Sequence, residues 1–573
     1  MSPTRGLIFD RNGVLLAENR PSFTLVLHPN KIEDLTKTLA ELETLVTVLE
    51  TDKQRFEARL QRTRRLGEGV PLRFDLDEAE QARLAVNQHK WVGVDVEAEL
   101  IRHYPLAELT AHVVGYVGRI NEREEAKIDK AAYAGTQHIG KIGLERFYES
   151  RLLGTVGSER VESDARGRIS RVLERIDPQP GQNLSLFLDT TVQRVAQEAL
   201  GDRRGAVVAI ELPTGGVVAM TSTPSFDSNL FVQGIDHQTY NKLNQTQDRP
   251  LYNRALKGQY PPGSTIKPLV ALAALERGVA NWEYRLWDPG FYQLEGGDHQ
   301  YRDWKKGGHG WVDMHSAIVQ SCDTYFYELS HRLEIDAMHD FLSLFGLGQE
   351  TEIDLGGEGS GILPSRAWKR ASRGQVWYPG ETLITGIGQG FMLATPLQLA
   401  YAIAVLATEG QTSRPRLWRE APTLPVWSES ILNDVDGREH SADVSQRRAP
   451  WREENGARII QAMEDVVHSP RGTARRLGKD AAYKIAGKSG TAQVLGVPQG
   501  EKYDAEAIAE RYRDHALFVA FAPVDNPLIA VAVIVENGGS GGGTAGPVAR
   551  AVMDAYLLGT TGSRDAVSLG SGG

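Results

Sequence analysis

A serine and a lysine lie close together in the segment Tyr260–Leu269, which reads YPPGSTIKPL. A Pro-Pro-Gly turn comes directly before Ser264, and an apolar run with helical character follows it. Lys267 lies three residues after Ser264, about one helical turn away on the same face. A serine hydroxyl becomes a nucleophile when a neighbouring base takes its proton, and a lysine with a lowered pKa can be that base. Ser-x-x-Lys alone is short, so a capping serine followed by a surface lysine would be the simpler interpretation.

Two further segments place a second serine and a second lysine downstream. Ser321 opens the tripeptide Ser-Cys-Asp, which ends at Asp323, and Lys488 opens Lys-Ser-Gly-Thr, which ends at Thr491. Ser-x-x-Lys, Ser-x-Asn and Lys-Thr-Gly together form the active-site set of penicillin-binding proteins and class A β-lactamases. The three segments occur here in that order, each in a suitable local context, which outweighs the structural interpretation of Ser264 and Lys267.

Potential metal ligands cluster between the first two motifs: Asp288, Asp298, His299, Asp303, His309 and Cys322. Carboxylate, imidazole and thiolate groups all bind zinc. The best quartet is Asp288, Asp303, His309 and Cys322, because the Gly- and His-rich stretch between them suits a local metal clamp. Four protein ligands leave no open position, so such a zinc would be structural. The alternative is that Cys322 is a small buried hydrophobe and His309 a polar loop residue.

The strands and helices predicted around these motifs follow a simple order along the chain. From about residue 185 onward, β-rich runs occur at both ends and helical patterns fill the middle. The order predicts one central antiparallel sheet flanked by helices, with strands at Gly205–Leu212, Val217–Ser222, Tyr483–Ala486, Thr491–Val494, His515–Ala522 and Leu528–Glu536. A helix over Asp189–Leu200 and a closing helix over Pro547–Leu558 should pack against it. We expect Gly538–Gly543 and Asn433–Asn455 to be loops.

The N-terminal third of the chain has a different pattern of charged and apolar residues from the rest. Ile32–Arg65 and Asp75–Gln88 have helical spacing and many charges, while Phe23–Leu27 and Trp91–Val96 read as short strands. We predict an α+β domain over residues 1–182, a catalytic domain over 183–560 and a disordered tail over 561–573. The charges of the first segment are best interpreted as a solvated helical face.

Composition narrows the class of protein. The chain has 573 residues, 41% of them hydrophobic and 24% charged, which excludes disorder of the whole chain. A formal net charge of −10 argues against a general nucleic-acid binder. The single cysteine, Cys322, excludes an internal disulfide framework. No apolar run reaches the roughly 18 residues of a membrane-spanning helix.

Beyond the three catalytic motifs, other segments carry a family resemblance. The chain resembles a class B penicillin-binding protein along nearly its whole length, on the evidence of Arg5–Gly13, Gly140–Glu145 with Tyr148, and the glycine-rich Gly386–Gly390. No glycosyltransferase domain fits before residue 185, which argues against class A. Asp323 stands where the family usually has Asn, and this resembles the elongation-specific (rod-shape) branch. Ionised Asp only accepts hydrogen bonds, so Asp323 can hold Lys267 or a substrate amide N–H.

The resemblance implies a fold and a set of roles. The fold is the penicillin-binding serine-transpeptidase fold, preceded by an elongated pedestal of the dimerisation type. Ser264 would attack the penultimate D-Ala carbonyl of a stem peptide, Lys267 would take its proton, and Ser321 would relay a proton to the leaving amine. Lys488 would supply positive charge for the terminal carboxylate. Further substrate contacts would come from Ser489, Gly490 and Thr491, with the backbone N–H groups of Ser264 and Thr491 as the oxyanion hole.

The resemblance also implies partners and a location. β-Lactams would trap Ser264, and an amine from a second stem peptide would complete a peptidoglycan cross-link. A SEDS-type glycan polymerase in the membrane and a periplasmic scaffold would be the protein partners, and a structural zinc fits the elongation branch. We expect the protein at the periplasmic face of the inner membrane, anchored by a helix upstream of this chain.

Two alternatives remain open at this point. One is a hydrolase, either a D,D-carboxypeptidase or a serine β-lactamase, although no water-activating base can be assigned by motif. The other is a penicillin-binding sensor or scaffold without turnover. Slow loss of the acyl group would argue against a lactamase, and amine-dependent product would separate an enzyme from a sensor.

Overall fold

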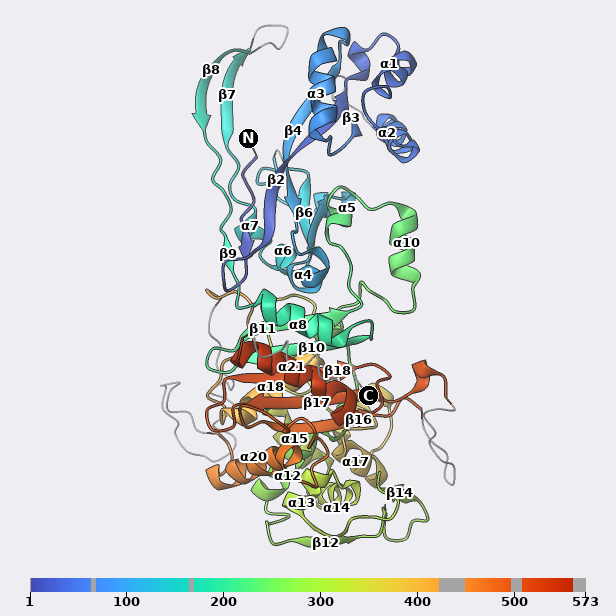
Figure 1. The fold of residues 1–573 in the computed structure, drawn as a ribbon, viewed down its shortest axis with the longest axis vertical. Helices are drawn as coiled ribbons and strands as arrows, with labels where there is room; N and C mark the ends of the chain where they lie inside the picture. Colours follow the sequence, from blue (N-terminus) through green and yellow to red (C-terminus); the bar gives the residue numbers. More distant parts are fainter. Residues whose placement is uncertain are drawn as a thin grey trace.

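The computed structural model describes residues 2–62, 69–134, 136–163, 169–421, 449–495 and 508–559. The tail predicted for residues 561–573 and most of the predicted loop 433–455 lie outside the described residues. The molecule is elongated, with the N-terminal third at one end and a helix-covered sheet toward the other (Figure 1).

A long strand, β2 (Leu15–Leu27), forms the axis of the N-terminal part. It pairs antiparallel with β4 (Val94–His103), β3 (Val70–Arg73) and β1 (Ile8–Phe9). Three helices surround its far end: α1 (Leu35–Leu42), α2 (Glu50–Arg62) and α3 (Glu78–Asn87). Both helical segments predicted from the charge pattern are therefore helical, whereas β2 is longer than expected because pairing on both of its edges extends it.

The rest of the pedestal lies between this end and the catalytic sheet. It contains β5 (Tyr116–Arg119) paired with β6 (His138–Ile142), and an arm of β7 (Ser158–Ser163) and β8 (Ile169–Ile176). Its helices are α4 (Ala107–Val114), α5 (Glu122–Glu125), α6 (Gly143–Phe147) and α7 (Glu149–Leu152). β9 (Leu184–Ser185) pairs parallel with β1 and leads into the catalytic part.

A buried ion-pair cluster joins the two N-terminal motifs. Glu145 is completely buried and accepts from Arg5 Nε at 2.7 Å and from Arg102 Nε at 2.6 Å. Burial alone would raise the pKa of Glu145, but the two guanidinium groups outweigh it and hold the pKa below its usual value. Removing one partner of such a buried cluster typically costs about 3–5 kcal/mol, because a charge is left uncompensated.

The catalytic part is built on one antiparallel sheet, as predicted, and the sheet has five strands. Its strand order is β11 (Gly216–Thr223), β10 (Gly205–Glu211), β18 (Ile529–Val535), β17 (His515–Ala522) and β16 (Ala486–Ala492). Strands from both ends of the domain thus meet in the middle of the sheet. β18 is buried along its whole length, and all of β17 but His515 is buried too, which matches their nearly continuous apolar sequences.

The prediction of two strands on either side of Lys488 was wrong. β16 runs without a break from Ala486 to Ala492 and carries the Lys-Ser-Gly segment in its middle, with Lys488 opposite Val519. Lysine, serine and glycine have low strand propensity, but the pairing with β17 supplies the tertiary context that overrides it.

Helices cover both faces of the sheet. α8 (Thr190–Leu200), capped by Asp189, packs with α21 (Gly546–Leu557), while α18 (Pro396–Ala407) is buried along its whole length against β10, β17 and β18. The remaining helices are α9 (Asn229–Val232), α10 (His237–Gln245), α11 (Arg254–Lys257), α12 (Lys267–Glu276), α13 (Met314–Gln320), α14 (Asp323–Leu333), α15 (Ile335–Ser343), α16 (Arg366–Arg373), α17 (Pro379–Gly386) and α20 (Glu453–His468). Figure 1 shows α12–α15 on the side of the sheet away from the pedestal.

Two small two-stranded sheets lie toward the end of the molecule farthest from the pedestal (Figure 1). β12 (Arg285–Asp288) pairs with β15 (Gly310–Asp313), and β13 (Phe291–Gln293) pairs with β14 (Gln300–Arg302). The Gly- and His-rich stretch predicted as a loop is therefore partly strand. The last part of the Gly538–Gly543 segment, predicted as a loop, belongs to a short π-helical turn, Gly541–Ala545.

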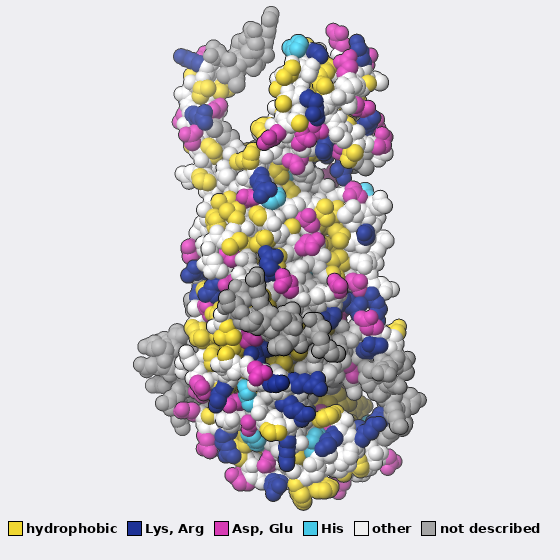
Figure 2. Space-filling view, viewed as in Figure 1, with side chains coloured by type: hydrophobic (Ala, Val, Ile, Leu, Met, Phe, Trp, Pro, Cys, Tyr) yellow, Lys and Arg dark blue, Asp and Glu magenta, His cyan; other side chains and the backbone are white. Residues whose placement is uncertain are grey.

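Charges of both signs are mixed over the surface of the pedestal (Figure 2), as expected of a solvated face. Within the described residues, no helix combines the length and apolar character needed to cross a membrane.

Candidate active site

Ser264 lies in a short 3-10 turn, Gly263–Ile266, that leads into α12. It is half-buried and lines a cavity of about 400 Å³ between the end of α12 and the edge of the sheet. Gly263 makes this approach possible: its φ is +56°, and a Cβ there would lie 2.5 Å from the Thr491 carbonyl oxygen. Only glycine tolerates both the positive φ and the close approach. Gly263 therefore allows the turn that carries Ser264 to lie in direct contact with β16.

Ser321 occupies a strained junction between two helices. It follows α13 with φ 59° and ψ 38°, a left-handed conformation that is uncommon for serine, and α14 begins two residues later at Asp323. The sharp turn brings Ser321 Oγ 2.9 Å from Lys488 Nζ and 3.4 Å from Lys267 Nζ. The strain is thus located where one hydroxyl must meet two lysines.

Lys267 is completely buried at the start of α12. Its ammonium donates to Asp323 Oδ1 at 2.6 Å and to the Ser321 carbonyl oxygen at 2.9 Å. Ser264 is not among its hydrogen-bond partners in the described structure. Catalytic hydrogen bonds often tighten only when substrate is bound, so this arrangement is compatible with a base role and leaves that role as a prediction.

Lys488 is also completely buried, and its Nζ donates to Ser321 Oγ and to the Ser489 carbonyl oxygen. Burial and the positive charge of Lys267 lower the pKa of Lys488 well below its usual value, and the charge of Asp323 opposes them. The ammonium points toward Ser321 beneath the cavity, and the lining of the cavity does not include Lys488. Its charge therefore acts from below the surface that substrate would touch.

The exposed wall of the cavity is the outer edge of β16. Ser489, Gly490 and Thr491 line it, and β16 is the last strand of the sheet, so its free edge offers backbone N–H groups to a ligand. The cavity brings together Ser264, Ser321, Asp323, Ser489, Gly490 and Thr491, while Lys267 and Lys488 form its buried base.

Several further lining residues were not predicted as site residues from the sequence, and three of them make informative hydrogen bonds. Gln389 donates to the Thr491 carbonyl oxygen at 2.9 Å, and Thr473 exchanges a 2.8 Å hydrogen bond with Ser489 Oγ. The backbone N–H of Trp304 donates to Asp323 Oδ2 at 3.1 Å. Gln389 belongs to the glycine-rich segment already singled out and could have been found there, whereas nothing in the sequence around Thr473 marks it.

The four proposed metal ligands come together beside this site. One ligand atom from each of Asp288, Asp303, His309 and Cys322 lies within 4.8 Å of all the others. Asp298 and His299, the two further candidates, are not in this group. Asp303 Oδ2 also accepts from the backbone N–H groups of Asp323 and Thr324, so the cluster caps the first turn of α14 and positions the middle motif.

The residues of the cluster suit zinc. His309 Nδ1 lies 2.8 Å from Asp288 Oδ2, and Cys322 Sγ lies 3.4 Å from the same oxygen. His309 Nε2 is buried without a hydrogen-bond partner in the described structure. Burial and the charge of Asp303 raise the pKa of the Cys322 thiol, a penalty that a bound cation would reverse. Sulfur, nitrogen and carboxylate oxygen are the donors that tetrahedral zinc takes.

Two serines and two lysines assembled at the free edge of an antiparallel sheet define a penicillin-binding serine acyltransferase. Comparison with known families agrees: residues 205–554 match the penicillin binding protein transpeptidase domain, and residues 1–186 match the penicillin-binding protein dimerisation domain. The chain belongs to the elongation-specific class B penicillin-binding proteins. It is 45% identical over 558 residues to the peptidoglycan D,D-transpeptidase MrdA of Acinetobacter baumannii, covering 97% of this chain and 81% of that protein.

Solved structures give the same fold. The chain is similar to Pseudomonas aeruginosa PBP2 in complex with WCK 5153, at 44% identity and a TM-score of 0.72, covering 98% of this chain and 97% of the other. It is also similar to the Helicobacter pylori complex of PBP2 with MreC, at 28% identity and a TM-score of 0.82, covering 98% of both chains.

Proposed function

We propose that this protein cross-links peptidoglycan stem peptides as a D,D-transpeptidase through an acyl-enzyme on Ser264, during cell elongation. The observation that carries the proposal is the contact of Ser321 with both buried lysines directly below the cavity that Ser264 lines. A serine hydroxyl in contact with two lysines can take part in moving a proton away at one step and returning it at the next.

The reaction divides into two acyl transfers. Ser264 Oγ attacks the carbonyl carbon of the penultimate D-Ala and passes its proton to Lys267, which must be a neutral amine at that moment. The N–H groups of Ser264 and Thr491 stabilise the oxyanion. The C–N bond to the terminal D-Ala breaks, and the leaving amine receives a proton through Ser321. An amine of a second stem peptide then attacks the ester, forms the new amide bond and restores the Ser264 hydroxyl. Asp323 holds Lys267 in place throughout.

Intact-mass measurement with a β-lactam tests the nucleophile. We expect the chain to gain one drug mass and the Ser264→Ala variant to gain none, while Ser343→Ala, at the end of α15 and outside the cavity, behaves like the unaltered chain. An adduct on Ser264→Ala would contradict the proposal. Rapid drug loss without adduct would indicate a β-lactamase instead.

Product analysis then separates the enzyme classes. Incubated with a donor pentapeptide and an amine acceptor, a transpeptidase forms an amine-dependent product. Release of D-Ala without that product would indicate a D,D-carboxypeptidase. A stable adduct with neither product would indicate a sensor or scaffold.

The cluster of Asp288, Asp303, His309 and Cys322 would hold a structural zinc. Its support is the buried, unpartnered His309 Nε2 and the position of Asp303 at the start of α14. Elemental analysis of the purified chain should give one zinc per molecule, lost in Cys322→Ser and retained in His299→Ala. Folded, fully acylated protein without metal would contradict the proposal.

A SEDS-type glycan polymerase and a periplasmic scaffold would be the partners, at the periplasmic face of the inner membrane. The support is that a similar Helicobacter pylori structure is a complex of PBP2 with MreC, and that another similar structure is described as a peptidoglycan synthase complex. Size-exclusion chromatography of the purified chain with a purified scaffold should show one co-eluting complex. Separate elution at concentrations above about 10 μM would contradict a stable scaffold interaction.

A further inference from the structure

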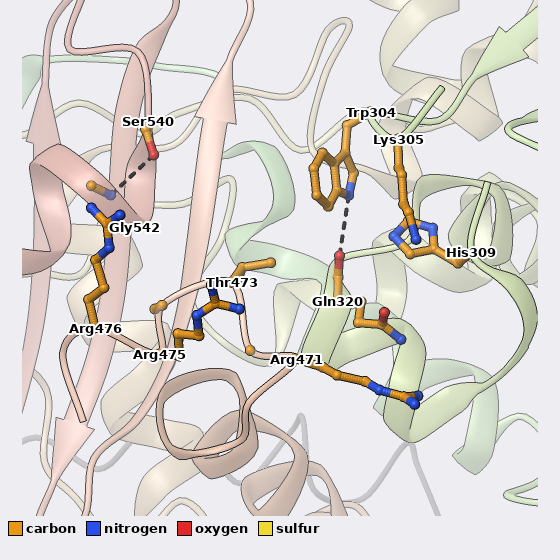
Figure 3. Close-up of a pocket in the computed structure, with 13 residues that line it drawn as sticks. Trp304, Lys305, His309, Gln320, Arg471, Thr473, Arg475, Arg476, Ser540 and Gly542 are labelled. Carbon is orange, nitrogen blue, oxygen red and sulfur yellow. Dashed lines mark hydrogen bonds between the residues drawn. The ribbon is translucent and has the colours of Figure 1, made fainter. Parts of the chain in front are cut away.

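A second cavity, of about 370 Å³, adjoins the one that contains Ser264. Its own lining includes four cationic side chains, Lys305, Arg471, Arg475 and Arg476, and Figure 3 shows the three arginines along its lower side with Trp304 and Lys305 above. Trp304, Thr473, Ser540 and Gly542 line both cavities, so the two spaces are continuous.

The charge of this second cavity is uncompensated. No aspartate or glutamate is among the residues that line it, and none of its four cationic side chains forms an ion pair within the described part of the chain. Arg475 donates to the Pro470 carbonyl oxygen, which fixes its side chain on the wall. A concave site lined by positive charges alone attracts anions, and the planar guanidinium group of arginine can form two parallel hydrogen bonds to a carboxylate.

Two contacts with β16 show where the basic cavity lies relative to Ser264. Thr473, at its border, bonds Ser489 Oγ, and Gly541 lies so close to Gly490 that a Cβ on it would approach the Gly490 carbonyl oxygen to 2.3 Å. The basic cavity thus continues from the part of β16 that would hold the terminal carboxylate of the donor peptide. That is the side on which the leaving D-Ala departs.

We propose that this basic cavity binds carboxylates of the acceptor stem peptide and holds its amine over the acyl-enzyme. The inference rests on the proposed transpeptidase function. Aminolysis of the ester is the chemical reverse of acylation, so the attacking amine arrives from the position that the leaving amine vacated. An acceptor placed there extends away from Ser264 into the basic cavity. Lys488 faces Ser321 from below, so the arginines supply the positive charge that an acceptor meets.

The test removes two arginines whose side chains form no ion pair or hydrogen bond with the described residues, and it leaves the catalytic residues intact. The variant is Arg471→Gln with Arg476→Gln; the matched control is Arg419→Gln with Lys479→Gln, two exposed cations outside the cavity. Each chain receives a donor pentapeptide and either an acceptor peptide with free carboxylates or the same peptide amidated. Adduct formation with a β-lactam reports acylation in every variant.

We expect aminolysis by the carboxylate acceptor to fall about five- to ten-fold in the double arginine variant, at subsaturating acceptor. Aminolysis by the amidated acceptor, β-lactam acylation and the control variant should not change. Two results for the double arginine variant would overturn this inference and leave the proposed function standing. One is normal acylation with unchanged aminolysis; the other is an equal loss of aminolysis with both acceptors. Failure of the unaltered chain to form a β-lactam adduct would overturn the proposed function, and the inference with it.

Discussion

The ammonium of Lys267 lies 2.6 Å from Asp323 Oδ1, and the other oxygen of that carboxylate accepts from the backbone N–H of Trp304. Asp323 opens α14 and Lys267 opens α12, so this one ion pair joins the first turns of two helices at the base of the cavity. Lys267 is completely buried, and the side chain of Asp323 is 13% exposed, so water screens the pair only weakly.

Replacing Asp323 by Asn should therefore slow acylation and change its pH dependence. The amide keeps the shape but removes the negative charge between two lysines, and that charge raises the pKa of Lys488. We expect β-lactam acylation to fall by about 10²-fold at neutral pH, because Lys267 loses the carboxylate that holds it in place. Its pH profile should move to lower pH, because the lost charge raises a lysine pKa. Stopped-flow acylation across the pH range measures both effects, with Asp298→Asn as a control outside the site. An unchanged profile would mean that the ion pair has no part in proton transfer.

Replacing Lys488 by Met should reduce acylation without reducing thermal stability. Burial lowers the pKa of Lys488, which means that the folded state holds its ammonium at a cost, and methionine fills a similar volume without that cost. We expect the thermal midpoint to stay the same or rise, while acylation falls by about 10²-fold because Ser321 loses its donor. A clear fall in the midpoint would show that the contacts to Ser321 and Ser489 outweigh the desolvation of the ammonium.

Elements with one unambiguous signal could be predicted from the sequence. His515–Ala522 is a strand at the predicted residues because eight successive residues suit a buried strand and a Pro-containing turn follows them. Asp189 caps its helix as the capping preference requires. β16 could not be predicted, because its central Lys-Ser-Gly is held as a strand only by pairing with β17, which lies more than twenty residues away in the sequence.

The candidate site shows the same limit. The set and order of the three motifs predicted that Ser264, Ser321 and Lys488 share one site. The ligand types predicted the quartet that comes together at Asp288, Asp303, His309 and Cys322. The direction of Lys488 depends on the left-handed turn at Ser321, which follows from the packing of α13 against α14 and not from residue type. The contribution of Arg471–Arg476 depends on a loop brought to the cavity by α20, and no local pattern marks it.

Gly263→Ala tests the close contact between the nucleophile's turn and β16. Its new Cβ would lie 2.5 Å from the Thr491 carbonyl oxygen, so β16 or the turn must move. We expect acylation to fall by at least about 10²-fold, since the proposed oxyanion hole takes its two N–H groups from these two segments. Gly278→Ala is the matched control: its φ is +66°, but a Cβ there meets nothing within 4 Å. Equal effects in both variants would show that backbone strain alone, and not displacement of β16, explains the loss.

The stability of the pedestal should fall in mild acid because of His112 in α4. Burial lowers the pKa of His112 to about 4, against 6.5 for an exposed histidine. Unfolding exposes the ring, so the unfolded state takes up the proton first as the pH falls, and stability is lost between pH 6.5 and 4. This group alone should lower the free energy of unfolding by about 2 kcal/mol from pH 7 to pH 5. The rings of His112 and Phe226 lie 5.2 Å apart, so this site already holds two rings in contact. We expect His112→Phe to fold and to lose this part of the pH dependence in urea unfolding. His89→Gln, at an exposed position, should keep it. The same pH dependence in His112→Phe as in the unaltered chain would show that other groups govern acid stability.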